Sequence, residues 1–177
     1  MTIGIFHYAE IDGVRNATDS AIRGLFSRAV EERREVWTFS SGGIVSADAF
    51  LDEMKHTRSQ LFVPDHLGEV MGFVWANNFQ ARSCEMHFCF YRAAKPYLDT
   101  LGKACLGHVL NMQDADGYIL DLVTGITPAW NKAAVGFIKS LGMVILGEIP
   151  NACFRPEKGK SFPGIVSYCT REVLNHG

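Results

Sequence analysis

Two side chains suited to proton transfer lie close together in an aromatic-rich segment, Cys84 to Tyr91, in the middle of the chain. The segment has the composition of a β-strand, and the side chains of a strand alternate between its two faces. Alternation places Glu85, His87, Cys89 and Tyr91 on one face, so Glu85 and His87 are adjacent candidates for a general base. His87 is the better tuned to neutral pH. The alternative, that a strand histidine beside a glutamate forms a structural pair, stays open.

A second candidate lies where the next helix is expected to begin, in the stretch Asp99-Thr100-Leu101-Gly102-Lys103-Ala104. A glycine there lets a ligand approach the backbone closely, and the free N–H groups of a first helical turn bind phosphate or pyrophosphate. Lys103 adds a positive charge at the rim. One glycine at a helix start is also common in helices that bind nothing, so both interpretations stay open.

A third region runs from Thr127 to Gly142 and is predicted to be helical. Thr127 and Pro128 suit the cap and the first turn of this helix, and Gly142 suits its end. Asn131 lies in the first turn and is followed on one face by Ala134, Phe137 and Leu141. Small and aromatic residues at this spacing also pack a helix on a sheet, which is the alternative interpretation.

The elements that position these residues follow from the hydrophobic periodicity. Helical spacing of apolar residues predicts four helices, over residues 18–37, 46–54, 101–112 and 127–142. Alternating or short apolar runs predict strands over residues 3–8, 60–64, 69–76, 84–91, 118–124, 143–149 and 165–170. Asp12-Gly13 is expected to end the first strand, and Pro156 to Pro163 is expected to be a loop. This order predicts a mixed α/β sheet domain, and the sequence shows no internal repeat or linker.

Composition excludes several classes of protein. The chain has 177 residues, 47% of them hydrophobic, so it can bury a sizeable core within one domain, residues 1–177. Its formal net charge of −2 disfavours binding to nucleic acid or to an anionic membrane. The N-terminus does not resemble a signal peptide, and no stretch approaches the roughly 18 apolar residues of a membrane span. We therefore expect a cytoplasmic protein.

The five cysteines form no Cys-x-x-Cys pair, so neither a zinc ribbon nor a disulfide framework is predicted. A metal cluster of Cys84, His87 and Cys89 is not expected either, because alternation points Cys84 to the other face of its strand and a fourth ligand is missing. No metal is predicted.

At these motifs the chain resembles the GNAT superfamily of acetyl-CoA-dependent N-acetyltransferases. The pyrophosphate loop of that family matches at Gly102 and Ala104, with Asp99 where glutamine or arginine is usual. A second family segment is matched at Asn131, Ala134, Phe137, Lys139 and Gly142-Met143. Shorter members encoded by phages look most similar. The resemblance implies a mostly antiparallel sheet of about seven strands flanked by about four helices.

The resemblance also implies where acetyl-CoA binds. The cofactor would lie in a V-shaped gap between the strands at residues 84–91 and 118–124. Pantetheine would pair with the main chain at Phe88, Cys89 and Phe90, near Asn131 and Phe137. The pyrophosphate would meet the backbone amides of Thr100, Leu101, Gly102, Lys103 and Ala104.

The implied reaction is direct transfer of an acetyl group to a primary amine of an unknown acceptor. His87 or Glu85 would act as the base. The tyrosine that many members use as general acid is Ile138 here, and Tyr168 or a water molecule would replace it. Trp75, Asn77 and Asn78 would line an acceptor pocket, or else belong to core and turn. The alternative function is a catalytically inactive CoA-binding or phage-related interaction protein. An exposed strand edge near the C-terminus offers a surface for a homodimer.

Overall fold

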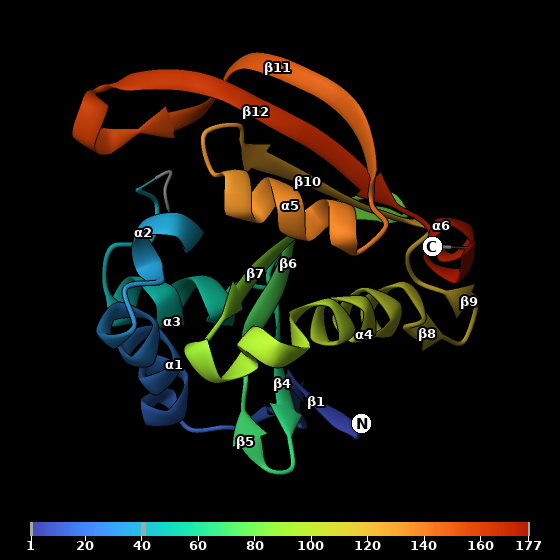
Figure 1. The fold of residues 1–177 in the computed structure, drawn as a ribbon. Helices are drawn as coiled ribbons and strands as arrows, with labels where there is room; N and C mark the ends of the chain where they lie inside the picture. Colours follow the sequence, from blue (N-terminus) through green and yellow to red (C-terminus); the bar gives the residue numbers. More distant parts are fainter. Residues whose placement is uncertain (1, 40–41, 177) are drawn as a thin grey trace.

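A sheet of seven strands in the order β1-β4-β6-β7-β10-β12-β11 organises the chain (Figure 1). The computed structural model describes residues 2–39 and 42–176. All neighbouring strands in this order are antiparallel except β7 and β10, which are parallel. The strands are β1 (Ile3–Tyr8), β4 (Gln60–His66), β6 (Gly72–Gln80), β7 (Ser83–Phe90), β10 (Leu122–Pro128), β11 (Val144–Arg155) and β12 (Lys160–Cys169). The predicted mixed, mostly antiparallel sheet is confirmed.

Several short strands lie outside this order. The strand β5 (Glu69–Val70) pairs with β4 and is the eighth strand of the main sheet. Asp12-Gly13, expected to end the first strand, is the turn of a hairpin between β2 (Glu10–Ile11) and β3 (Val14–Arg15), and both turn residues have positive φ angles. The start of the strand predicted over residues 118–124 is wrong, because Tyr118 belongs to a separate hairpin of β8 (Gln113–Asp114) and β9 (Gly117–Tyr118).

Helices cover both faces of the sheet. The helices α1 (Asp19–Glu31) and α3 (Ala47–Lys55) bury apolar residues against β4, β6 and β7 in one core. Their caps are Thr18 and Ser46, whose side chains accept hydrogen bonds from Ala21 N and Ala49 N. The helices α4 (Leu98–Leu110) and α5 (Lys132–Ser140) pack on the other face in a second core, and α6 (Arg171–His176) follows β12. We call these faces the α3 side and the α5 side.

Three helix boundaries differ from the prediction. The helix expected over residues 18–37 is interrupted at Arg33, which has φ of 57°, so a separate turn of helix, α2 (Glu35–Thr38), follows α1. The 3-10 helix η1 (Arg92–Tyr97) runs directly into α4, which begins three residues before the expected start. Thr127 and Pro128 end β10 instead of opening α5, and Asn131 caps that helix by accepting a hydrogen bond from Ala134 N at 3.1 Å.

The loop predicted between Pro156 and Pro163 is largely part of a long hairpin. β11 continues to Arg155, a 3-10 turn, η2 (Pro156–Lys158), reverses the chain, and β12 begins at Lys160. In Figure 1 the tip of this hairpin lies above α2, and Pro156 Cγ lies 3.4 Å from the ideal Cβ position of Gly42. No helix among the described residues is long and apolar enough to cross a membrane.

Candidate active site

The strands β7 and β10 pair over only three residues and then separate. Their partners are Leu122 with Ser83, Val123 with Cys84 and Thr124 with Glu85. On its other side, β7 stays paired with β6 as far as Phe90. Within residues 2–39 and 42–176, no strand therefore pairs with the backbone edge of β7 from Met86 to Phe90 on the side of β10. The gap expected between these two strands is present.

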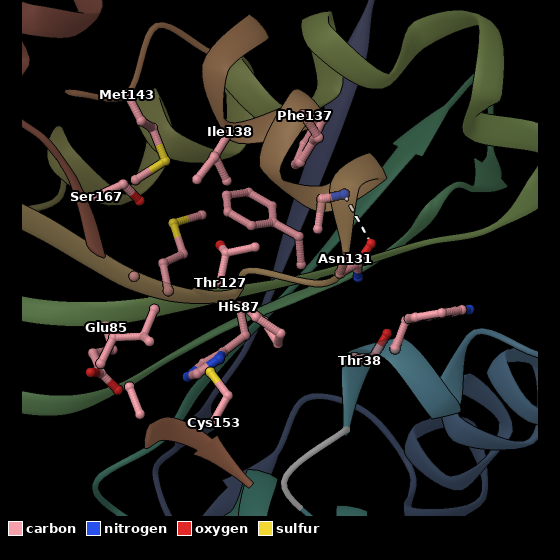
Figure 2. Close-up of a pocket in the computed structure, with 18 of the residues that line it drawn as sticks. Thr38, Glu85, His87, Thr127, Asn131, Phe137, Ile138, Met143, Cys153 and Ser167 are labelled. Atoms are coloured by element: carbon pink, nitrogen blue, oxygen red, sulfur yellow. Dashed lines mark hydrogen bonds between the residues drawn. The ribbon is translucent and has the colours of Figure 1, made fainter. Parts of the chain in front are cut away.

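A cleft lies in this gap and consists of two adjoining cavities of about 330 and 520 Å³. Six residues line both cavities, namely Trp37, Thr38, Phe88, Asn131, Ala134 and Phe137. The smaller cavity is also lined by Glu85, His87 and Ser167 (Figure 2). The larger one is also lined by Cys89, Phe90 and Leu98.

The cleft passes through the sheet from one face to the other. Along β7, Cys84 and Met86 belong to the core on the α5 side, with Phe88 and Phe90 packed against it, whereas Cys89 and Tyr91 belong to the core on the α3 side. The predicted alternation is confirmed, and it places Glu85 and His87 on the α3 side. In Figure 2, Ser167, Ile138 and Phe137 lie in the upper part of the cleft and His87 and Glu85 in the lower part.

His87 is held by two neighbours on β6. Its ring stacks on Trp75 with centroids 4.5 Å apart, and Nε2 lies 2.9 Å from Asn77 Oδ1. Because a carbonyl oxygen only accepts, Nε2 carries a proton and Nδ1 keeps its lone pair. Burial lowers the pKa of His87 below 6.5, which outweighs the opposite effects of Glu85 and Glu53. His87 is thus a neutral, fixed imidazole at pH 7.

Glu85 does not pair with His87. Its Oε2 accepts a hydrogen bond from Asn78 Nδ2 at 2.7 Å, and within the described residues no hydrogen bond joins the two candidate bases. This outcome excludes the structural Glu–His pair that the sequence left open. Asn77 and Asn78 therefore hold the two candidate bases, while the buried Trp75 supports the ring of His87 from behind.

An aromatic wall borders the cleft on the α5 side. Phe137 of α5 meets Phe88 and Phe90 edge to face, with ring centroids 5.5 and 5.8 Å apart. The residues predicted to contact the cofactor near this wall all line the larger cavity, namely Phe88, Cys89, Phe90, Asn131 and Phe137. Two cations also border that cavity: Lys132 at the start of α5, and Arg34, whose buried Nε lies 4.0 Å from Glu32 Oε2.

Solved structures share this architecture. Spermidine N-acetyltransferase from Vibrio cholerae, solved with CoA and spermine, matches 98% of this chain and 98% of its own length at 15% identity, with a TM-score of 0.71. The chain has the GNAT fold. RimL, the ribosomal L7/L12 alpha-N-protein acetyltransferase solved with CoA, matches with a TM-score of 0.68 at 10% identity, covering 89% of this chain and 92% of its own.

A third match is yncA from Salmonella typhimurium, solved with acetyl-CoA, with a TM-score of 0.60 at 14% identity over 95% of this chain and 93% of its own. No protein-family model matches the sequence, and no curated protein matches it. At these identities the likeness shows the fold alone, and nothing in the matches points to a phage-encoded protein.

The pyrophosphate loop expected for a GNAT fold is not a loop here. The residues Thr100, Leu101, Gly102, Lys103 and Ala104 lie inside α4, and none of them lines either cavity. A Cβ on Gly102 would lie 2.5 Å from Leu141 Cδ2 and 2.8 Å from Phe137 Cζ. The glycine therefore allows α4 and α5 to approach closely and is not exposed to a ligand. Asp99 points to α5 as well, where its Oδ1 accepts a hydrogen bond from Ser140 Oγ at 2.6 Å.

Tyr168, the predicted substitute for the general acid, is outside the cleft. It pairs with Thr124, which in turn pairs with Glu85, so Tyr168 lies two strand spacings, roughly 10 Å, from Glu85. Its neighbour Ser167 faces the cleft instead. Ser167 is fully buried, and no side chain or backbone group in the described part of the chain hydrogen-bonds to its Oγ.

Several of the lining residues were not predicted from the sequence. In α2, Trp37 was the last residue of a helix predicted to be continuous and Thr38 follows it, and Cys153 and Phe154 of β11 lie just before the expected loop. Ser167 was detectable in principle, because alternation along its strand groups it with the buried Cys169. Among the described residues, no three His, Cys, Asp or Glu side chains are grouped as a metal site requires.

Proposed function

We propose that the protein is an N-acetyltransferase that transfers an acetyl group from acetyl-CoA directly to a primary amine. The observation that carries this proposal is the free edge of β7 from Met86 to Phe90, beside a cleft that passes through the sheet to His87. An extended chain with amide groups can hydrogen-bond to such an edge, as an added strand does. A neutral base at the far end of the cleft is what an amine nucleophile needs.

The residues around the larger cavity fit the parts of acetyl-CoA. The pantetheine arm would pair with the backbone of Phe88 to Phe90 and pack against Phe137. Arg34 and Lys132 would meet the phosphates, in place of the backbone amides of residues 100–104. When bound, acetyl-CoA supplies an activated acetyl thioester.

The smaller cavity supplies the groups for transfer. A primary amine has a pKa of about 10 and arrives protonated, so the Glu85 carboxylate attracts it. Nδ1 of the neutral His87 then accepts a proton, which frees the nitrogen lone pair to attack the acetyl carbon. The hydroxyl of Ser167 donates a hydrogen bond to the departing sulfur. Full protonation of that sulfur is not required, because a thiol with a pKa of about 8.5 is a tolerable leaving group.

A second candidate function is CoA binding without catalysis. It is favoured by the placement of residues 100–104 inside α4 and by Ile138 at the position of the usual tyrosine. The free edge of β7 fits both candidates, whereas the neutral His87 beside the smaller cavity favours catalysis. The cytoplasmic location and the homodimer expected from the sequence stay predictions.

The test is calorimetric titration with acetyl-CoA, followed by an assay of thiol release with amines. We expect a Kd in the micromolar range or tighter and amine-dependent release. In Ser167→Ala we expect kcat to fall while the Kd for acetyl-CoA stays the same. Binding without release would favour the non-catalytic candidate, and no binding at millimolar acetyl-CoA would contradict both.

A further inference from the structure

The smaller cavity opens to solvent through large apolar side chains. Trp37 of α2, Ile126 of β10 and Phe154 of β11 all line it, and their exposed fractions are 50%, 44% and 46%. These side chains come from three separate elements, yet they meet at the cavity that holds His87 and Glu85. Apolar side chains that remain this exposed around a cavity gain free energy when a ligand covers them.

The charge in the same cavity is a single carboxylate. Of the described residues that line it, Glu85 is the one acidic side chain, and burial lowers the pKa of the neighbouring His87. No lysine or arginine among them offers a partner for an acidic acceptor. A cationic nitrogen therefore has one place to bind, beside Glu85 and within the same cavity as His87.

Together these features discriminate between kinds of amine. A polyamine carries further ammonium groups, and the described lining offers no second carboxylate for them. An amino sugar would bring hydroxyl groups against Ile126 and Phe154, whose side chains offer no hydrogen bonds, so the hydroxyls would lose their water without compensation. An apolar body, in contrast, would cover the exposed side chains while its amine reaches Glu85.

We propose that the acceptor is a primary amine attached to an apolar, aromatic body, a class represented by arylalkylamines. The inference rests on the proposed function and adds the acceptor class to it. The ring of the acceptor packs between Trp37, Ile126 and Phe154, and its ammonium group faces Glu85. The ammonium group gives one proton to His87, the freed lone pair forms the new N–C bond at the acetyl carbon, and the C–S bond breaks. The second proton of the nitrogen passes to the departing sulfur, so that an amide and the thiol of CoA are the products, and His87 releases its proton to solvent.

The experiment compares three probes with the intact protein at saturating acetyl-CoA: 2-phenylethylamine, spermidine and glucosamine. We expect kcat/KM for 2-phenylethylamine to exceed the other two values at least about tenfold, since the apolar body covers exposed side chains. In Phe154→Ala, the KM for 2-phenylethylamine should rise about tenfold with kcat little changed. Leu146→Ala is the matched control, because Leu146 lies on the same strand, is 67% exposed and does not line the cleft.

Each outcome decides the inference. Preference for spermidine or glucosamine overturns the acceptor class and leaves acetyl transfer intact. Equal KM values in Phe154→Ala and Leu146→Ala overturn the proposal that the exposed apolar side chains bind the acceptor. Absence of thiol release with 2-phenylethylamine overturns it as well. Failure of acetyl-CoA to bind, measured separately by calorimetry, contradicts the proposed function itself.

Discussion

Gly102, at the contact between α4 and α5, and Gly125, at the opening between β7 and β10, show how differently one residue type serves the two regions. A Cβ on Gly102 would collide with Leu141 and Phe137 at 2.5 and 2.8 Å. A Cβ on Gly125 would lie 3.7 Å from Met86 O and 3.8 Å from Ser167 Oγ, in ordinary contact and inside the cleft. The first glycine is needed by a helix, and the second leaves room for a ligand.

A glycine in a sequence motif therefore does not reveal which group approaches its backbone. Gly102 was singled out because it matches a pyrophosphate loop, but the group that comes close to its backbone is a neighbouring helix. Gly125 carries no motif and lines the smaller cavity. We therefore expect substitutions at the α4–α5 contact to change stability and substitutions at the β7–β10 opening to change activity.

The largest effect is expected at the opening, for His87→Gln. Loss of a general base typically costs roughly 10²–10⁴-fold in rate, so kcat with an accepted amine should fall by at least about 100-fold. His108→Gln is the matched control, because burial also lowers the pKa of His108, which lies on α4 outside both cavities. A loss in His87→Gln that is no greater than in His108→Gln would contradict the assignment of the base.

The pH dependence of the unmodified protein also tests the assignment of His87 as the base. Burial lowers the pKa of His87 below 6.5, and the base must be neutral to act. The rate is therefore lost only as pH falls through this lowered pKa, and the acidic limb of a plot of kcat/KM against pH, which reports the free protein, should lie below pH 6.5. A limb above that value would contradict a buried imidazole as the base.

An intermediate effect is expected at the helix contact, for Gly102→Ala compared with Gly107→Ala. Both changes add helix propensity to α4, but a Cβ on Gly107 meets only Leu174 Cδ2, at 3.5 Å. Overpacking should make Gly102→Ala less stable than Gly107→Ala by about 1–3 kcal/mol, measured by urea unfolding. Equal stabilities would show that Leu141 and Phe137 move aside without cost.

The smallest effect is expected for Gly125→Ala. The added methyl group fits the fold but occupies the cleft between Met86 O and Ser167 Oγ. We expect the Kd for acetyl-CoA to rise about tenfold, or about 1.4 kcal/mol, with the thermal unfolding midpoint unchanged. Gly136→Ala is the control, since a Cβ there would meet nothing within 4 Å and Gly136 lines neither cavity.

Local patterns in the sequence predicted much of the sheet and the residues that share one face of the site. Alternation along β7 correctly grouped Glu85 with His87, because the strand keeps its pleat through the site. Apolar spacing located the four main helices, and the helix predicted from residue 46 begins where the side chain of Ser46 caps α3. These features depend on neighbours in the sequence, which is the information that periodicity contains.

The remainder depended on contacts between distant segments. β11 was predicted to end at Ile149, but it continues to Arg155 as an exposed strand held by pairing with β12, so burial left no pattern in its sequence. The start of α4 was misplaced because η1 continues the helical path through Pro96. Tyr168 and Ser167 are neighbours in sequence and lie on opposite faces of β12, and the position of β12 beside β10 places Ser167, not Tyr168, at the cleft.

The short pairing of β7 with β10 also has a consequence for the mechanics of the sheet. It joins a half formed by β1, β4, β6 and β7 to a half formed by β10, β12 and β11 through three residue pairs. Each half is continuous in hydrogen bonding, and its strands lie within one stretch of the sequence, as is typical of units that open cooperatively. The shared core on the α5 side, which contains Phe62 and Met86 from one half and Val123 and Cys169 from the other, therefore does more than backbone pairing to keep the two halves together beside the cleft.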